Sequence, residues 1–302
     1  MYKKFFGLRT NPFGINPDPR FLWMTPHTKE VLTCLDYGIR TRKGFIVLTG
    51  EVGTGKTTLL KTLLSSLSNS HVATAFVFNP RMEFSDLLYL VMTDFGIEVK
   101  SSTKSQMLLQ LYHWLLQRRV AGLTAALIID EAQSLSLELL EEIRLLTNLE
   151  TDTEKLLQIV LSGQPELEAK LKLPETRQLR QRIALLCRTR PVASADCRAY
   201  IEARLRIAGA ADSVGPVFSS GAIEAIFRYS QGIPRIINLL CEHALVAAYA
   251  DQLRPIPPVI IHEIATEFTL DELAPALTGD PHMPSPQTQT AANGQMSKEM
   301  HK

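Results

Sequence analysis

The sequence predicts an α/β domain built on a parallel β-sheet, followed by a small all-helical domain. Three observations lead to this fold class. In residues 1–190, short apolar runs alternate with helical patterns, as in consecutive β-α-β units. A glycine-rich segment joins the first of these runs to the first helical pattern. From about residue 191 the strand signals fade, and proline and glycine separate segments that all look helical.

The elements of the first domain can be placed one by one from these patterns. Strands are expected over residues 45–49, 72–78, 125–129 and 156–161, with helices over 57–67, 84–95, 106–117 and 137–149. The apolar runs are typical of parallel strands that are covered on both faces. Helices over 193–208, 219–230, 235–249 and 258–268 would form the second domain, residues 191–270. Residues 271–302 are rich in Pro, Thr, Gln and Ser and lack aromatic residues, which predicts a disordered tail.

Composition narrows the class of protein. The net charge of the 302 residues is +1, so the molecule as a whole gives no electrostatic argument for nucleic acid or membrane binding. No apolar run approaches the roughly 18–20 residues that span a bilayer, and the N-terminus lacks the apolar core of a signal peptide. The cysteines have no zinc-ligand spacing and are expected to be thiols in a reducing compartment. We therefore expect a cytoplasmic protein. The four cysteines are Cys34, Cys187, Cys197 and Cys241.

The strongest motif is the glycine-rich segment that follows the first expected strand. It fits the pattern G-x-x-x-x-G-K-[ST] fully, and a helix is expected directly after it. Its glycines let successive backbone N–H groups point at phosphate oxygens, Lys56 would bind the β- and γ-phosphates, and the Thr57 hydroxyl would ligate Mg²⁺. The segment predicts a binding site for ATP and Mg²⁺. Its residues are Gly50, Glu51, Val52, Gly53, Thr54, Gly55, Lys56 and Thr57.

Two carboxylates follow the apolar strand 125–129, at the sheet edge where α/β proteins bind their ligands. Asp130 is expected to hold Mg²⁺ through water, and Glu131 to polarise the attacking water as a general base. Together with the glycine-rich loop, they predict hydrolysis of ATP to ADP and phosphate. A nucleotide switch without turnover is the alternative, and Glu131 argues against it because a pure switch needs no general base.

Polar residues elsewhere are candidates for supporting roles. After strand 156–161, Gln164 is the first choice for positioning the attacking water and Ser162 the second, with a simple strand-end turn as the alternative. In the arginine-rich segment 177–190, Arg182 is the better candidate for a finger on a neighbouring subunit's γ-phosphate, and Arg180 the second. That segment could instead be a solvated helix face or a DNA-contacting patch.

Two further segments have open alternatives. Arg235 follows Gly-Ile-Pro at the start of an expected helix, where it could reach the γ-phosphate from the second domain or be an ordinary loop residue. The aromatic and apolar segments 5–8, 11–13 and 17–22 either pack beside the adenine or cover the edge of the sheet. We assign residues 1–190 to the first domain, and within it residues 1–44 form an adenine-side segment.

The motifs in this order resemble the AAA+ ATPases and, more narrowly, the ExeA/GspA family associated with general secretion and pilus biogenesis. The resemblance covers about residues 1–270. It implies an AAA+ α/β domain with a helical lid, assembly that depends on ATP, and sensor roles for Gln164 and Arg235. The matching segments are 6–8, 11–13, 17–21, 44–45, 50–58, 130–133, 146–150, 163–167 and 232–235. The segment 50–58 extends the glycine-rich motif by one residue, Thr58, which is also expected to contact the nucleotide.

The resemblance also sets the expected function and partners. Secretion members of the ExeA type have a transmembrane helix and a peptidoglycan-binding part after the ATPase, which this sequence lacks. Shorter relatives serve pilus or exopolysaccharide systems, and transposition ATPases of the TniB type share the core and bind DNA. We expect an ATPase that acts as a homo-oligomeric ring or filament in assembly or regulation of a cell-envelope machine. A partner protein of a secretion, pilus or polysaccharide system would hold it at the inner membrane, and a DNA-binding ATPase for transposition is the main alternative.

Overall fold

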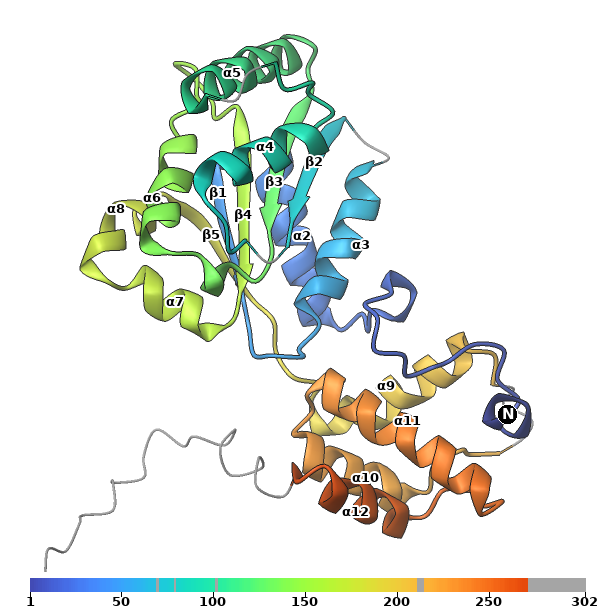
Figure 1. Ribbon diagram of the computed structural model, residues 1–302. Coiled ribbons are helices and arrows are strands. Elements are labelled where there is room, and N and C mark those ends of the chain that lie inside the picture. The colour runs from blue at the N-terminus through green and yellow to red at the C-terminus, as the bar shows by residue number, and fades with distance from the viewer. Residues whose placement is uncertain (69–70, 79, 101–102, 211–214, 271–302) are drawn as a thin grey trace, which may run out of the picture.

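The sheet of the protein is parallel throughout and has the strand order β2-β3-β4-β1-β5 (Figure 1). The computed structural model describes residues 1–68, 71–78, 80–100, 103–210 and 215–270. Four strands lie where the sequence predicts them, within two residues at each end. The expected disordered tail, 271–302, lies outside the described residues. The strands are β1 (Phe45–Thr49), β2 (Val72–Val77), β3 (Thr124–Ile129), β4 (Leu157–Gly163) and β5 (Ile183–Arg188).

Helices cover both faces of this sheet, and the alternation of strand side chains decides which residues meet which helices. On one face, Phe45 and Val47 of β1 join a buried cluster with α4 to α8. On the other face, Ile46 and Leu48 pack against α2 and α3. Apolar residues therefore occur at every position of the central strands, as the sequence indicates. The helices are α2 (Pro26–Arg40), α3 (Lys56–Ser68), α4 (Phe84–Asp94), α5 (Lys104–Val120), α6 (Leu137–Leu146), α7 (Pro165–Leu171) and α8 (Arg177–Arg180).

Two elements that the sequence analysis did not predict, β5 and α2, lie together at one side of the sheet. Strand β5 pairs with β1, and helix α2 packs against β5. In β5, exposed and half-buried residues alternate because the strand is at the sheet edge, although residues 183–187 form a continuous apolar run. In α2, the buried residues Val31, Leu35 and Ile39 recur every four positions, which is the helical spacing. Helix α7, which follows β4, was not predicted either.

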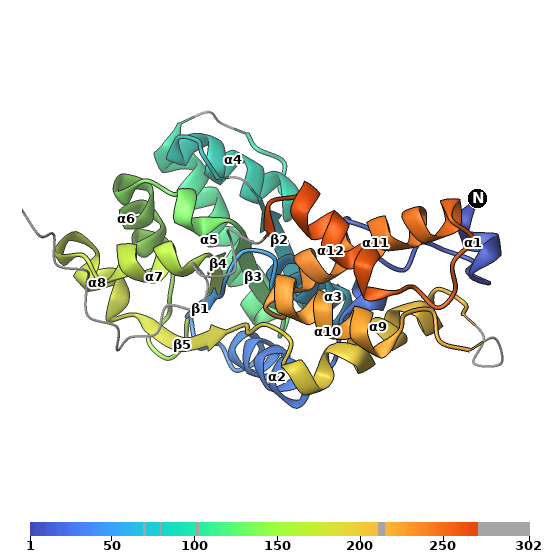
Figure 2. The same ribbon diagram turned by 90° about the horizontal axis from the view of Figure 1, so that it is seen from below.

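A C-terminal helical bundle lies beside the carboxyl ends of the strands (Figures 1 and 2). Its four helices match the expected ones within two residues at each end. Phe6, Leu8 and Phe13 from the start of the chain are buried in the same apolar cluster as these helices. The first residues thus pack on the bundle and do not cover the sheet edge. The bundle consists of α9 (Ser194–Ile207), α10 (Ser220–Ser230), α11 (Pro234–Ala250) and α12 (Pro258–Glu267), and the short helix α1 (Tyr2–Phe5) contacts α11.

None of the described helices is long and apolar enough to cross a membrane.

Candidate functional site

A cavity of about 900 Å³ lies between the sheet and the helical bundle. Its walls come from residues 13–31, the loop after β1 with the start of α3, residues between 189 and 204, and the first turns of α11, together with Glu131 and Gln164. The volume falls in the range of about 300–1,000 Å³ that is usual for small-molecule sites. Across the cavity, the glycine-rich segment faces both the N-terminal segment and the bundle.

The loop after β1 owes its shape to glycines. Gly53 and Gly55 have φ values of +80° and +92°, which side-chain-bearing residues rarely adopt. At Gly53 an added Cβ would lie 2.7 Å from the Cβ of Arg235, so only glycine lets the loop and α11 approach this closely. The backbone N–H of Arg235 donates to the carbonyl oxygen of Gly53 at 3.2 Å. The loop is therefore in direct contact with the start of the bundle helix α11.

Lys56 begins helix α3 and lines the cavity. Its Nζ donates to the carbonyl oxygens of Gly50 and Glu51, at 2.7 and 3.0 Å. Burial lowers the pKa of Lys56, and nearby carboxylates, with Glu131 the largest contributor, oppose that shift. The ammonium group is held over the loop, where the carbonyl oxygens and carboxylates keep a buried cation tolerable.

Asp130 follows β3 and is 2% exposed. Its Oδ2 accepts a hydrogen bond from the Thr57 hydroxyl at 2.7 Å, and its Oδ1 accepts one from the Ser162 hydroxyl at 2.8 Å. Ser162 is fully buried at the end of β4 and does not line the cavity, so its visible role is to hold Asp130. A carboxylate and a hydroxyl in contact are oxygen donors of the kind that Mg²⁺ prefers.

Glu131 and Gln164 both line the cavity. The Gln164 side-chain amide donates to Oε2 of Glu131 at 3.2 Å, and the amide of Gln133 donates to the same oxygen at 2.6 Å. The predicted general base and the first choice for a water-positioning residue are thus neighbours. Sequence reasoning missed Gln133, although its place two residues after Glu131 was a usable signal.

Arg235 lines the cavity beside the loop, as the position of its helix predicts. Its positive charge also contributes to lowering the pKa of Lys56, which places the two cations near each other. Such a pair suits a ligand that carries several negative charges.

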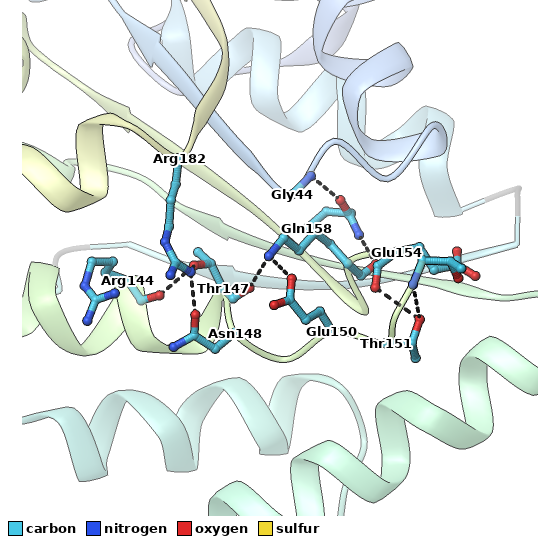
Figure 3. A network of polar contacts seen from close by, with 11 residues as sticks. Gly44, Arg144, Thr147, Asn148, Glu150, Thr151, Glu154, Gln158 and Arg182 are labelled. Carbon is cyan, nitrogen blue, oxygen red and sulfur yellow. Dashed lines mark hydrogen bonds and ion pairs between the residues drawn. The ribbon is translucent and has the colours of Figure 1, made fainter.

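Arg182 belongs to a different group of polar residues, which also includes Gly44, the residue just before β1 (Figure 3). Its guanidinium donates to the side chains of Thr147 and Asn148, the latter at 2.6 Å. It directly precedes β5, whose first residue Ile183 pairs with Phe45 at the start of β1. The loop leaves the other end of β1, five residues on, a separation of roughly 16 Å at about 3.3 Å per residue. Arg182 is therefore at the amino end of the strands and cannot reach the loop of its own chain.

The N-terminal segment takes part in the site through residues 13–28. Phe13 and Phe21 line the cavity, and the guanidinium of Arg204 lies 4.7 Å from the Phe21 ring centre. Arg204 also donates to the Pro12 carbonyl oxygen at 2.7 Å, which fixes the segment to the bundle. The segment therefore forms part of the cavity wall, and its packing beside a bound base stays a prediction.

Comparisons with known proteins identify the relatives of this chain. Residues 39–171 match the AAA domain family. The chain is 43% identical over 251 residues to General secretion pathway protein A from Aeromonas hydrophila, a stretch that covers 83% of this chain and 45% of the relative. The chain therefore spans less than half the length of that relative.

Several solved structures have the same fold as this chain at low sequence identity. The ORC2 protein of Aeropyrum pernix superposes with a TM-score of 0.63 at 18% identity, over 85% of this chain and 71% of that one. For Cdc6p from Pyrobaculum aerophilum the TM-score is 0.65 at 18% identity, over 85% and 70%. The RuvB motor of Thermotoga maritima gives 0.57 at 16% identity, over 87% and 75%. At these identities the likeness shows the fold alone, and that fold is the nucleotide-binding AAA+ fold.

Proposed function

We propose that this chain, which belongs with the AAA+ P-loop proteins related to General secretion pathway protein A, binds ATP with Mg²⁺ and hydrolyses it to ADP and phosphate. One observation carries the proposal. Thr57 and Asp130 are joined by a 2.7 Å hydrogen bond at the loop, and Lys56, Glu131, Gln164 and Arg235 line the same cavity. These are the groups that metal-assisted phosphoryl transfer to water needs.

In the proposed reaction, each residue has a role that follows from its charge and its position. The loop 50–58 offers backbone N–H groups to the phosphates, and the N-terminus of α3 adds its positive dipole end. Lys56 and Arg235 neutralise the β- and γ-phosphate charge. Glu131 accepts a proton from the attacking water, while Gln164 orients that water beside it. Closure of the bundle over the cavity would exclude bulk water.

The donor set at the loop fits Mg²⁺. Mg²⁺ prefers hard oxygen ligands and keeps several of its own waters, and the Thr57 hydroxyl with the Asp130 carboxylate supplies such oxygens. Thr57 and Asp130 would hold the metal, which would supply positive charge to offset the negative charge of the phosphates. The Asp130 carboxylate is held in place because Ser162 and the Glu131 backbone N–H both donate to its Oδ1.

Metal removal tests this function directly. Phosphate release should require both ATP and Mg²⁺, and an excess of EDTA should reduce it to background, because no protein cation replaces the metal between Thr57 and Asp130. The measurement is a coupled phosphate assay, with EDTA followed by re-addition of Mg²⁺. ATP turnover that is unaffected by EDTA would contradict the metal-assisted mechanism.

The active unit is proposed to be a homo-oligomer in which an arginine of one subunit completes the site of the next. Arg182 was the first candidate from the sequence, but its guanidinium is engaged with Thr147 and Asn148. Arg180 is exposed on α8 and makes no ion pair or hydrogen bond with the described residues. Both arginines remain candidates, and Arg182 would first have to leave its partners.

A mixing experiment identifies the finger. Arg180→Ala and Arg182→Ala are each expected to bind ATP normally, and the true finger should lose about 10³-fold in turnover. Mixing that variant with Glu131→Gln should restore hydrolysis to about a quarter of wild type, because one interface in four then pairs an intact Glu131 with an intact arginine. Specific activity of the wild type should rise with protein concentration. No rescue for either arginine, with activity independent of concentration, would exclude a finger acting between subunits.

The relationship to General secretion pathway protein A favours a role in a cell-envelope machine. We propose that ATP hydrolysis drives assembly or regulation of a secretion, pilus or exopolysaccharide system, and that a partner protein holds the chain at the cytoplasmic face of the inner membrane. Deleting the gene and scoring secreted protein, pili and exopolysaccharide tests this assignment. Unchanged levels of all three would remove it.

The DNA-binding alternative gains no support from the basic groups. A continuous basic stripe would need Arg40–Lys43 and the arginines of 177–206, yet Arg42 pairs with Glu154 and Arg40 with Asp36. Arg188 pairs with Glu168, and Arg204 is buried. Such pairs reduce the charge that is available to phosphates.

A further inference from the structure

The turn after β3 has an unusual backbone. Glu131 has a φ of +56°, in the left-handed region that residues other than glycine, asparagine and aspartate seldom adopt. The short 3₁₀ helix Ala132–Ser134 follows at once. The chain therefore turns sharply at the predicted general base, and the side chain of the residue two positions later points back toward Glu131. Backbone conformations of this kind persist where surrounding contacts hold them.

Gln133 is the residue that returns. Its side-chain Nε2 donates to Oε2 of Glu131 at 2.6 Å, while its Oε1 accepts from the backbone N–H of Gln164 at 3.1 Å. One amide thus joins the carboxylate to the first residue after β4. The Gln164 side chain donates to the same Glu131 oxygen. Both bonds fall on Oε2, and Oε1 has no hydrogen-bond partner within the described residues.

The surroundings of Gln133 are shaped for this bridge. A Cβ on Gly163 would lie 2.9 Å from the Gln133 Oε1, so glycine at the end of β4 leaves the room that the amide occupies. Lys170 on α7 donates to the Gln133 carbonyl oxygen at 2.7 Å and to the Leu135 carbonyl oxygen. Side chain and backbone of Gln133 are thus held from β4 and from α7. Two independent anchors fix the amide that touches Glu131.

We propose that Gln133 is a positioning residue, whose side-chain amide holds Oε2 of Glu131 so that Oε1 faces the attacking water. The inference rests on the proposed ATP hydrolysis and adds a residue that acts through Glu131. A carboxylate on a two-torsion stem has many rotamers, and a donor fixed by two anchors selects one of them. Gln133 is not part of the cavity lining, and its side chain bonds to Glu131 and Gln164 and not to Thr57 or Asp130, so replacing it should leave ATP binding unchanged.

Two substitutions test the hydrogen bonds of the Gln133 amide. Gln133→Met keeps the length and removes both bonds. Gln133→Glu keeps an oxygen that can accept from the Gln164 N–H but replaces the donor to Glu131 by a second negative charge. Both should lower kcat by about 10- to 100-fold, because a misplaced base costs rate in that range, and should leave KM for ATP within about twofold. Steady-state phosphate release over a range of ATP concentrations measures the two constants.

A double-mutant comparison distinguishes positioning from a merely structural role. In a Glu131→Gln background, Gln133→Met should lower the residual rate by less than about twofold, because the group through which it acts is already gone. Ser134→Ala is the matched control: it lies in the same turn and loses the bond from its hydroxyl to the Glu131 carbonyl oxygen, not to the carboxylate. Its kcat should stay near that of wild type.

Each result decides the matter. Three results would overturn the inference: a wild-type kcat in Gln133→Met, an equal loss of kcat in Ser134→Ala, or a full additional loss in the double mutant. In each of these cases the proposed function would stand as long as the wild-type protein hydrolyses ATP. Absence of ATP hydrolysis by the wild-type chain would refute the proposed function itself, and the inference with it.

Discussion

Replacing Lys56 by alanine should weaken ATP binding by about 100-fold, the value of a charge-assisted hydrogen bond to a phosphate. The lysine Nζ lies over the loop, bonded to the Gly50 and Glu51 carbonyl oxygens, and it is the cation that the loop itself supplies. Without it the phosphate charge would face Asp130 and Glu131 with less compensation. Isothermal titration calorimetry with ATP and Mg²⁺ gives the dissociation constant.

The matched control for this substitution is Lys43→Ala, which removes one positive charge from an exposed position ahead of β1. It should bind ATP like the wild type. A thermal melt of both variants shows whether they fold. If folded Lys56→Ala bound ATP with wild-type affinity, the loop would not be the phosphate site and the whole assignment of the cavity would fail.

Replacing Glu131 by glutamine should retain binding of ATP with Mg²⁺ and lower turnover by about 10² to 10⁴, the usual contribution of a general base. The contact between Thr57 and Asp130 does not involve the Glu131 side chain, so the metal donors remain. The new amide oxygen can still accept a hydrogen bond from Gln133 or Gln164, which preserves the local geometry. Single-turnover phosphate release, together with calorimetry, separates the chemical step from binding.

Glu138→Gln, an exposed site on α6, makes the same change of charge away from the cavity and should keep full activity. Hydrolysis by Glu131→Gln within about threefold of wild type would show that another group accepts the proton.

The parts of the site that follow from the sequence are those in which local pattern and position coincide. The loop 50–57 could be placed because its motif itself requires a strand before and a helix after it, and β1 and α3 occupy those positions. Asp130 and Glu131 follow a continuous apolar strand, so their edge of the sheet is fixed by the parallel topology. In these segments the hydrophobic periodicity and the sequence motif predict the same structure.

The parts that were missed depend on contacts between distant segments. Strand β5 contains the apolar run 183–187, but Arg182 and Arg188 flank this run, and the sequence analysis interpreted the whole segment 177–190 as arginine-rich. The partners of Arg182, Thr147 and Asn148, precede it by more than thirty residues, and no spacing rule connects them. Gln133 is close to Glu131 in sequence, but its role depends on the left-handed turn and on the missing side chain of Gly163.

The helical bundle is joined to the sheet by two chain crossings (Figure 1). Residues 22–25 lead from the N-terminal segment into α2, and residues 189–193 lead from β5 into α9. A rigid body that is attached to another at two points keeps one rotational degree of freedom, about the line through those points, and loses sideways and twisting motion.

Both crossings contribute residues to the wall of the cavity, among them Trp23 and Thr189. A molecule in the cavity therefore sits beside the rotation axis, where a displacement of a fraction of an ångström corresponds to a much larger arc at the far helices of the bundle. The ratio is set by the distance from that axis. A partner moved by the proposed nucleotide cycle would therefore travel farthest if it bound the part of the bundle that is most distant from the cavity.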